Sequence, residues 1–262
     1  MPGSNSPMLP AALIALALLL ALGAVTWLVS LVKHDVSIVD SLWPVLILAA
    51  GLSYAAALPQ LGPRTAWVLC LASLWAVRLA LHITWRGWGE PEDRRYQRIR
   101  ARNEPGFRWK SLVLVFALQA ALAWVVSWSL LVALARQASW SWLDSLGVVL
   151  IVGGGLFEAV ADGQLARFKA GADNAGRVMD RGLWRTTRHP NYFGEWCVWW
   201  GFYLLALSVP AWWAVASPLL MTVLLLKVSG VTLLEQDITE RRPAYRDYVA
   251  RTNAFFPGWP KA

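Results

Sequence analysis

Long apolar stretches alternate with shorter polar segments along the whole chain. Seven of these stretches are long enough to cross a hydrocarbon core of about 30 Å as helices. They cover residues 9–31, 36–58, 66–85, 111–135, 142–161, 192–208 and 212–234. The pattern predicts an all-α fold, a polytopic membrane helical bundle of about seven transmembrane helices, and we expect residues 1–262 to form a single integral membrane domain. The first stretch lacks a basic leader, so we expect a retained helix rather than a signal peptide.

The composition narrows the class of protein. Of the 262 residues, 57% are hydrophobic and only 15% are charged, and the mean hydropathy is +0.46. These values exclude an ordinary soluble domain and a disordered tail protein. The two cysteines, Cys70 and Cys197, both lie within apolar stretches, which excludes a disulfide framework.

The basic residues predict the orientation of the helices. The net charge is +8, and most Lys and Arg residues lie between the apolar stretches rather than within them. If the N-terminus is outside, 20 of the 24 Lys and Arg residues fall on the inner side, where positive charge accumulates in membrane proteins. We therefore expect the N-terminus outside and the C-terminus in the cytoplasm, and we expect no binding to nucleic acid.

Several ionisable residues lie inside the predicted spans, where each costs roughly 2.5–3.5 kcal/mol unless it serves a polar task. Each lies within about 12 Å of the predicted cytoplasmic end, at about 1.5 Å per helical residue. They are Asp40, Arg78, His82, Glu158, Asp162, Glu195 and Lys227. Spacings of four residues place polar groups on one face of a helix. We expect these faces to meet in one polar chamber open to the cytoplasm; for any single residue, a structural ion pair or a snorkelling side chain is the alternative.

The two long inner loops contain many cations among Gly, Asn and Asp residues, a composition suited to phosphate or pyrophosphate. An anionic lipid surface would attract the arginines at 94–102 equally well. The sequence has no Rossmann glycine fingerprint and no Walker loop, and we interpret the glycines at 153–155 as a close helix contact. The histidines are scattered, so the sequence predicts no metal site.

Four segments resemble a known protein family. GLWRTTRHPNYFGEW at 182–196 and the tail at 245–257 resemble the C-terminal domain of the steroid 5α-reductase family, and most closely its bacterial DUF1295-like branch of unassigned substrate. DVSIVDSLW at 35–43 and the segment at 78–100 also resemble that branch. The resemblance implies an NADPH-dependent membrane reductase of the bacterial inner membrane, with its reductase-like region at 100–262. Such an enzyme saturates an activated carbon–carbon double bond in a hydrophobic substrate, steroid-like or another lipid.

The resemblance also implies where the cofactor binds. In that family an Asn and a Glu of the motif hold the nicotinamide end, and these match Asn191 and Glu195. Residues on the preceding helix and loop hold the ribose and phosphates; there Glu158 replaces the usual Asn, and Lys169 an Arg. The expected cofactor-binding residues are Arg78, Glu158, Asp162, Lys169, Arg177, Arg188, His189, Asn191, Tyr192, Glu195 and Tyr248.

Reduction of an enone also needs a group that stabilises or protonates the carbonyl oxygen. The steroid enzymes carry a Gln–Glu pair on an early helix, with a nearby Tyr, and the sequence indicates neither here. The basic, histidine-containing pattern of their last helix is also absent, replaced by LLEQDITERR at 233–242. Asp40 is the one early acid in a comparable place, and a buried carboxyl that stays protonated could donate. We expect Asp40 to be the donor, with His82 as second candidate and Glu195 as an orienting group.

Two other classes remain open. A membrane methyltransferase of the isoprenylcysteine carboxyl methyltransferase type, which uses S-adenosylmethionine, also has an RHPxY segment at a helix start. It would use Arg188, His189, Pro190, Tyr192, Glu235 and Tyr248. A transporter or assembly factor is the third class, although the sequence lacks the inverted repeats typical of transporters. The expected partners are a hydrophobic small molecule from the bilayer and membrane lipids.

Overall fold

The computed structural model describes residues 7–207, 209–228 and 243–259. Every regular element in these ranges is a helix and none is a strand, which confirms the predicted all-α fold. Within them, six helical segments are long and apolar enough to cross a membrane, as expected of an integral membrane protein. They are α1 (Met8–Lys33), α2 (Ile38–Ala57), α3 (Thr65–Gly87), the composite Phe107–Ala135, α8 (Trp142–Ala170) and the composite Pro210–Val228.

The composite segments are interrupted helices. The first comprises α5 (Phe107–Ser111), the π-helical η1 (Leu112–Ala117), α6 (Leu118–Val126) and α7 (Trp128–Ala135). The second follows the start of η4 (Val209–Val215) through α10 (Ala216–Val223) to η5 (Leu224–Val228). The last predicted span, 212–234, continues into residues 229–234, which lie outside the described residues.

The seventh predicted span, 192–208, corresponds to α9 (Pro190–Ala206). Its 17 residues extend about 25 Å at a rise of 1.5 Å per residue. That length is less than the hydrocarbon core of about 30 Å. Helix α9 is therefore a short helix, while α8 is longer than expected and extends nine residues beyond the predicted limit at Ala161.

The chain divides into two compact units. The first unit is Met1–Trp140 with Leu205–Ser217, and the second unit is Ser141–Leu204 with Pro218–Ala262. Each unit contains residues of candidate membrane spans. The prediction of a single domain over 1–262, with a reductase-like region at 100–262, stays a prediction.

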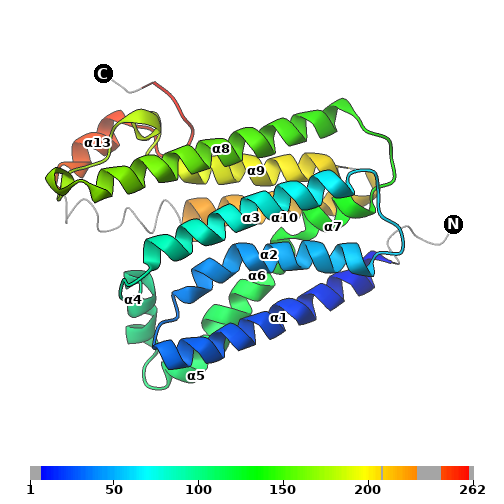
Figure 1. Cartoon of the computed structure of the whole chain (residues 1–262), viewed down its shortest axis with the longest axis horizontal. Helices are drawn as coiled ribbons and strands as arrows, with labels where there is room; N and C mark the ends of the chain where they lie inside the picture. The colour runs from blue at the N-terminus through cyan, green and yellow to red at the C-terminus, as the bar shows by residue number, and fades with distance from the viewer. Residues whose placement is uncertain (1–6, 208, 229–242, 260–262) are drawn as a thin grey trace. The chain divides into compact units, whose positions relative to one another are not determined.

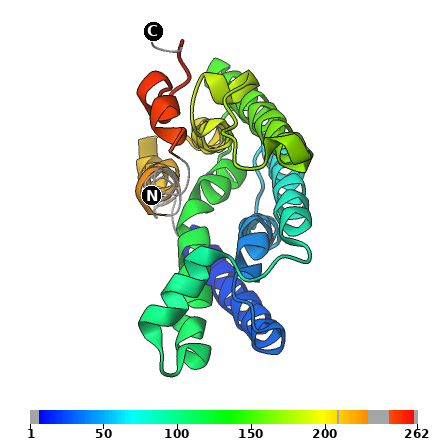
Figure 2. The ribbon, with the colours of Figure 1, turned by 90° about the vertical axis from the view of Figure 1, so that its left-hand side faces the viewer.

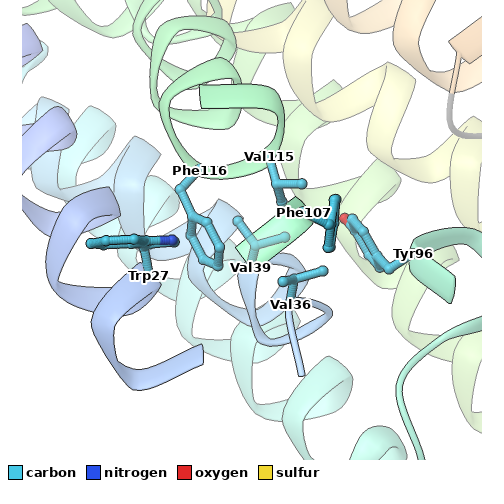
Figure 3. Close-up of a cluster of buried hydrophobic side chains, with 7 residues drawn as sticks. All are labelled: Trp27, Val36, Val39, Tyr96, Phe107, Val115 and Phe116. Carbon is cyan, nitrogen blue, oxygen red and sulfur yellow. The ribbon is translucent and has the colours of Figure 1, made fainter. Parts of the chain in front are cut away.

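In the first unit, α2 packs against both α1 and α3. Helices α4 (Arg94–Asn103) and α5 lie beside the turn that joins α1 to α2 (Figures 1 and 2). A cluster of buried apolar side chains holds these elements together (Figure 3). Its members are Trp27, Val36, Val39, Tyr96, Phe107, Val115 and Phe116. The cluster fixes α4 against the ends of the spanning helices, so polar groups on α4 have a defined position.

A buried arginine side chain connects two loops of the first unit. Arg64 precedes α3 and is fully buried. Its Nη1 donates to the carbonyl oxygen of Ala138 at 2.6 Å, and its Nη2 donates to that of Ser139 at 2.8 Å. Burying a guanidinium is costly unless its donors are satisfied. These bonds connect the loop before α3 to the loop that follows α7.

In the second unit, α8 and α9 run side by side (Figures 1 and 2). Glycines allow the close approach: a Cβ added at Gly194 would lie 2.5 Å from the carbonyl oxygen of Gly154, and one at Gly201 would lie 2.7 Å from that of Gly147. Small residues are the usual means by which membrane helices bring their backbones together. Of the glycines at 153–155, only Gly154 faces α9; the other two have open space around them. The predicted close helix contact is therefore confirmed at one position.

Candidate functional site

One polar contact of the second unit joins the motif to α8. Pro190 begins α9, a position where proline is favoured because its missing N–H would have no helical partner. Asn191 follows at once, and its Nδ2 donates to Oδ1 of Asp162 on α8 at 3.2 Å. Two residues predicted at opposite parts of a cofactor site, from segments 29 residues apart, are thus hydrogen-bonded to each other.

Acidic side chains gather around this contact. Glu158 lies one turn before Asp162 on α8, and the two residues are only 2% and 6% exposed. The backbone of Glu158 lies against Gly194 of α9, where an added Cβ would come within 2.7 Å of its nitrogen. Glu195 follows Gly194 and is 8% exposed. The glycine contact between the helices therefore places three buried carboxyl side chains and one amide in a small region of the second unit.

The segment before α9 is fastened to the C-terminal tail. Arg188 is buried, and its Nη1 donates to the carbonyl oxygens of Val249 at 3.2 Å and Thr252 at 2.6 Å. These carbonyls belong to the end of α13 (Tyr245–Arg251), where a helix leaves acceptors without helical donors. Tyr248 donates to the carbonyl oxygen of Trp184 from the other direction. Two of the residues predicted to bind cofactor thus hold the tail against the motif.

The other predicted cofactor residues of the second unit lie in two settings. His189 is buried, and its ring stacks on that of Tyr192 with centroids 5.5 Å apart and an angle of 5° between the planes. Lys169 and Arg177 are exposed, one in the last turn of α8 and the other in the loop that follows. The buried ring pair supports the start of α9, while the two cations are accessible to an anion.

In the first unit, Asp40 sits in the first turn of α2 and is bound by α4. Its Oδ2 accepts a hydrogen bond from Nη2 of Arg95 at 2.6 Å, and its Oδ1 accepts one from the phenol of Tyr96 at 2.6 Å. Nε2 of Gln119 donates to the Tyr96 oxygen at 3.3 Å. The sequence alone did not indicate a tyrosine near the early acid; in the structure Tyr96, 56 residues further along the chain, is its neighbour.

The surroundings of Tyr96 and Arg95 determine the charge states in this cluster. Burial raises the pKa of Tyr96 well above its ordinary value, and the Asp40 carboxylate raises it further. The phenol is therefore neutral and has a proton to donate. Burial works against the charge of Arg95, but the carboxylates of Asp40 and Asp93 outweigh it and raise the pKa of the guanidinium. Asp40 is thus an acceptor on both of its oxygens, held by a cation and a phenol.

A second ion pair anchors α4 to the turn before α2. Glu92 accepts two hydrogen bonds from Arg100, at 3.0 Å from Nε and 2.7 Å from Nη2. The Oε1 atom of Glu92 also accepts from the backbone nitrogen of Val36 at 2.9 Å. The Arg100 guanidinium lies 4.8 Å above the centroid of the Phe107 ring. Together with the Asp40 cluster, this pair determines which side of α4 faces the bundle.

The remaining predicted residues lie on other elements. Arg78 and His82 are half-buried on α3, and the His82 ring lies 6.3 Å from that of Trp85. Lys227 is exposed on η5. Glu235, which the methyltransferase hypothesis requires, and the rest of the segment at 233–242 lie outside the described residues. The single chamber shared by all predicted ionisable residues stays a prediction. Among described residues, no three His, Cys, Asp or Glu side chains are grouped to hold a metal ion.

Comparison with known proteins places the chain in a family. Residues 26–252 match a family described as a protein of unknown function, DUF1295. The chain belongs to this family. It is also 27% identical over 284 residues to an uncharacterized protein of Schizosaccharomyces pombe, an alignment that covers 93% of this chain and 79% of the yeast protein. No solved structure matches the chain.

Proposed function

We propose that this protein is an NADPH-dependent membrane reductase that saturates an activated carbon–carbon double bond of a hydrophobic substrate. The observation that supports this best is the hydrogen bond between Asn191 and Asp162. It joins the motif residue that the family resemblance assigns to the nicotinamide end and the helix that it assigns to the ribose. The proposed substrate enters from the bilayer, since the helices present mainly apolar surface.

The residues of the second unit fit a dinucleotide in their chemistry. The half-buried amide of Asn191 and the buried carboxyl side chains of Glu158, Asp162 and Glu195 can hydrogen-bond a carboxamide and ribose hydroxyls. The exposed cations nearby along the chain, Lys169 on α8 and the arginine at 177, suit phosphate groups. When bound, NADPH would supply the hydride. The side chains named here would hold and orient it.

For the carbonyl oxygen of the substrate we propose Tyr96 as the donor, in place of Asp40. Negative charge develops on that oxygen as the double bond is reduced, and a neutral O–H stabilises it or protonates it. Tyr96 is neutral and carries one hydroxyl proton, which it donates to Asp40 in the structure, so the hydroxyl must turn from Asp40 to the substrate oxygen when it acts as the donor. Arg95 holds the carboxylate in place. In this assignment Asp40 is a positioning residue, and the catalytic proton belongs to the phenol.

Ligand-dependent stability tests the cofactor assignment. A ligand that binds only the folded protein raises its unfolding temperature, by an amount equivalent to about 2.7 kcal/mol at a concentration of 100 Kd. The purified protein in detergent would be heated with NADPH, NADH, S-adenosylmethionine or buffer alone. We expect stabilisation by NADPH. Stabilisation by S-adenosylmethionine instead would replace the reductase with the methyltransferase, and a response to none of the three would contradict both.

Two variants make the test specific to the site. Asn191→Ala removes the amide that the proposal assigns to the nicotinamide end, so the shift caused by NADPH should disappear. Gln137→Ala is the matched control, because Gln137 is exposed in a loop and its side chain donates to the nearby Ala135 carbonyl oxygen. The control should keep the full shift. Equal shifts in both variants would place the cofactor elsewhere.

A further inference from the structure

Helix α4 has a half-buried set and an exposed set of arginines. Arg95 and Arg100 face the bundle, where they pair with Asp40 and Glu92 at 2.6 and 2.7 Å. The Glu92 side chain is only 10% exposed and that of Asp40 is 20% exposed. These two cations are therefore neutralised inside the first unit, and they prevent the helix from turning about its axis.

Three other arginines of α4 are exposed. Arg94, Arg98 and Arg102 recur every four residues, so they lie on one side of the helix, and all three are exposed. The apolar members of α4 that pack inward, Tyr96 and Ile99, lie between them in the sequence and on the other side. The outward arginines thus form a basic stripe about 12 Å long at 1.5 Å per residue.

This stripe lies at a membrane boundary. Helix α4 connects the end of the spanning helix α3, at Gly87, to the start of the next spanning segment, at Phe107. Three exposed tryptophans flank the connection: Trp85 is 66%, Trp88 81% and Trp109 64% exposed. Tryptophan is enriched where a membrane meets water. Indoles before and after α4 therefore place its exposed arginines at the level of lipid headgroups.

We propose that the outward face of α4 binds the headgroup of an anionic phospholipid. Guanidinium groups form paired hydrogen bonds with phosphate oxygens, which gives them a preference for this group over a neutral surface. The flanking indoles are the reason to choose a lipid rather than a free nucleotide, because they insert beside acyl chains. Each cation near an anionic leaflet strengthens binding by about fivefold. Three of them should therefore provide a preference of up to about 100-fold.

Binding of phosphatidylglycerol, measured in mixed micelles with phosphatidylcholine, tests this proposal. The purified protein would be titrated with a fluorescent phosphatidylglycerol at low and high salt. We expect saturable binding that weakens as salt rises, because exposed charges are screened. In the variant R94Q/R98Q/R102Q, affinity should fall by up to about 100-fold. Since all three residues are exposed, the variant should fold, and its unfolding temperature would be compared with that of the wild type.

The matched control places the same change in charge elsewhere. R181Q/R185Q/R246Q removes three exposed arginines of the second unit and should leave the affinity unchanged. Equal losses in both variants would show a general effect of net charge and overturn the proposal, as would unchanged binding by the α4 variant.

The third result that would overturn it concerns the cofactor. If the α4 variant loses stabilisation by NADPH, or if free phosphate competes with the lipid at millimolar concentration, the stripe binds a soluble phosphate instead. A charge-retaining variant, R94K/R98K/R102K, should keep most of the salt-dependent lipid binding. Single Gln variants, each weaker by about fivefold, replace the triple variant should it fail to fold.

Discussion

Two neighbouring glycines of α8 should respond in opposite ways to the same substitution. A Cβ at Gly154 would lie 2.6 Å from the carbonyl oxygen of Gly194 and 2.7 Å from the Cβ of Cys197. A Cβ at Gly153 meets nothing within 4 Å. The first atom in the way is backbone, so α8 and α9 must separate, whereas at Gly153 no neighbour has to move.

The size of the effect follows from these distances. Ordinary contact begins at 3.4 Å, so Gly154→Ala requires the helices to move apart by about 0.8 Å, at a cost of roughly 1–3 kcal/mol. Alanine recovers up to about 1 kcal/mol through its helix propensity. Gly153→Ala has that gain without the cost. The two variants should therefore differ in stability by about 2 kcal/mol, which corresponds to roughly 4–8 °C in unfolding temperature.

The same displacement should reach the candidate site. The Asn191–Asp162 hydrogen bond is already 3.2 Å long, and a separation of about 0.8 Å would break it. Thermal unfolding in detergent, with and without NADPH, measures both effects. Gly154→Ala should unfold earlier and lose the response to NADPH, while Gly153→Ala should match or exceed the wild type. If the two variants behave alike, the close approach of α8 and α9 does not organise the site.

Three further changes test other parts of the account. Tyr96→Phe should lower turnover by about 100-fold or more, since a general acid contributes 10²–10⁴, while NADPH affinity measured by titration stays the same; equal turnover would remove Tyr96 from the chemistry. Arg188→Ala should destabilise the protein by about 3–6 kcal/mol, because each of its two hydrogen bonds to the tail contributes about 1.5–3 kcal/mol, and should expose the tail to protease; an unchanged digestion pattern would contradict this. Burial opposes ionisation of Asp93, but the interactions with Arg95 outweigh burial and lower the pKa of Asp93 below the ordinary 3.8. The ionised carboxylate therefore stabilises the fold above about pH 4, and this stabilisation is lost as the pH falls through the lowered pKa. Asp93→Asn should flatten the acid limb of a stability–pH curve, and an identical limb would show that Asp93 does not contribute.

Sequence patterns were sufficient for the helices and for their close approach. Apolar stretches of membrane-spanning length identify helices whatever their partners, because the bilayer requires every backbone group to be bonded within the segment. The glycines at 153–155 indicated a close contact in the same way. Which of the three faces α9 depends on the rotation of α8 about its axis, and the glycine run itself carries no information about that rotation.

The partners of the charges could not be predicted in this way. Asp40 is held by Arg95, 55 residues away, and the spacing of residues along one helix says nothing about contacts with another. The sequence did contain a signal for Tyr96. Tyr96 and Ile99 are apolar residues three positions apart in the otherwise polar segment RRYQRIRARN, and this spacing indicates a buried face. Arg188 was expected to bind the cofactor, and its contacts with the tail depend on tertiary structure that the sequence pattern does not contain.

Equilibrium binding of NADPH to the purified protein is the most direct test of the proposed reductase. Energy transfer from tryptophan to the nicotinamide ring would be followed as NADPH is added, in the wild type, in Asn191→Ala and in Gln137→Ala. Saturable binding by the wild type and Gln137→Ala, with none by Asn191→Ala, is the predicted result. An absence of binding by the wild type, or equal binding by all three proteins, would contradict the assignment of the α8–α9 site to this cofactor.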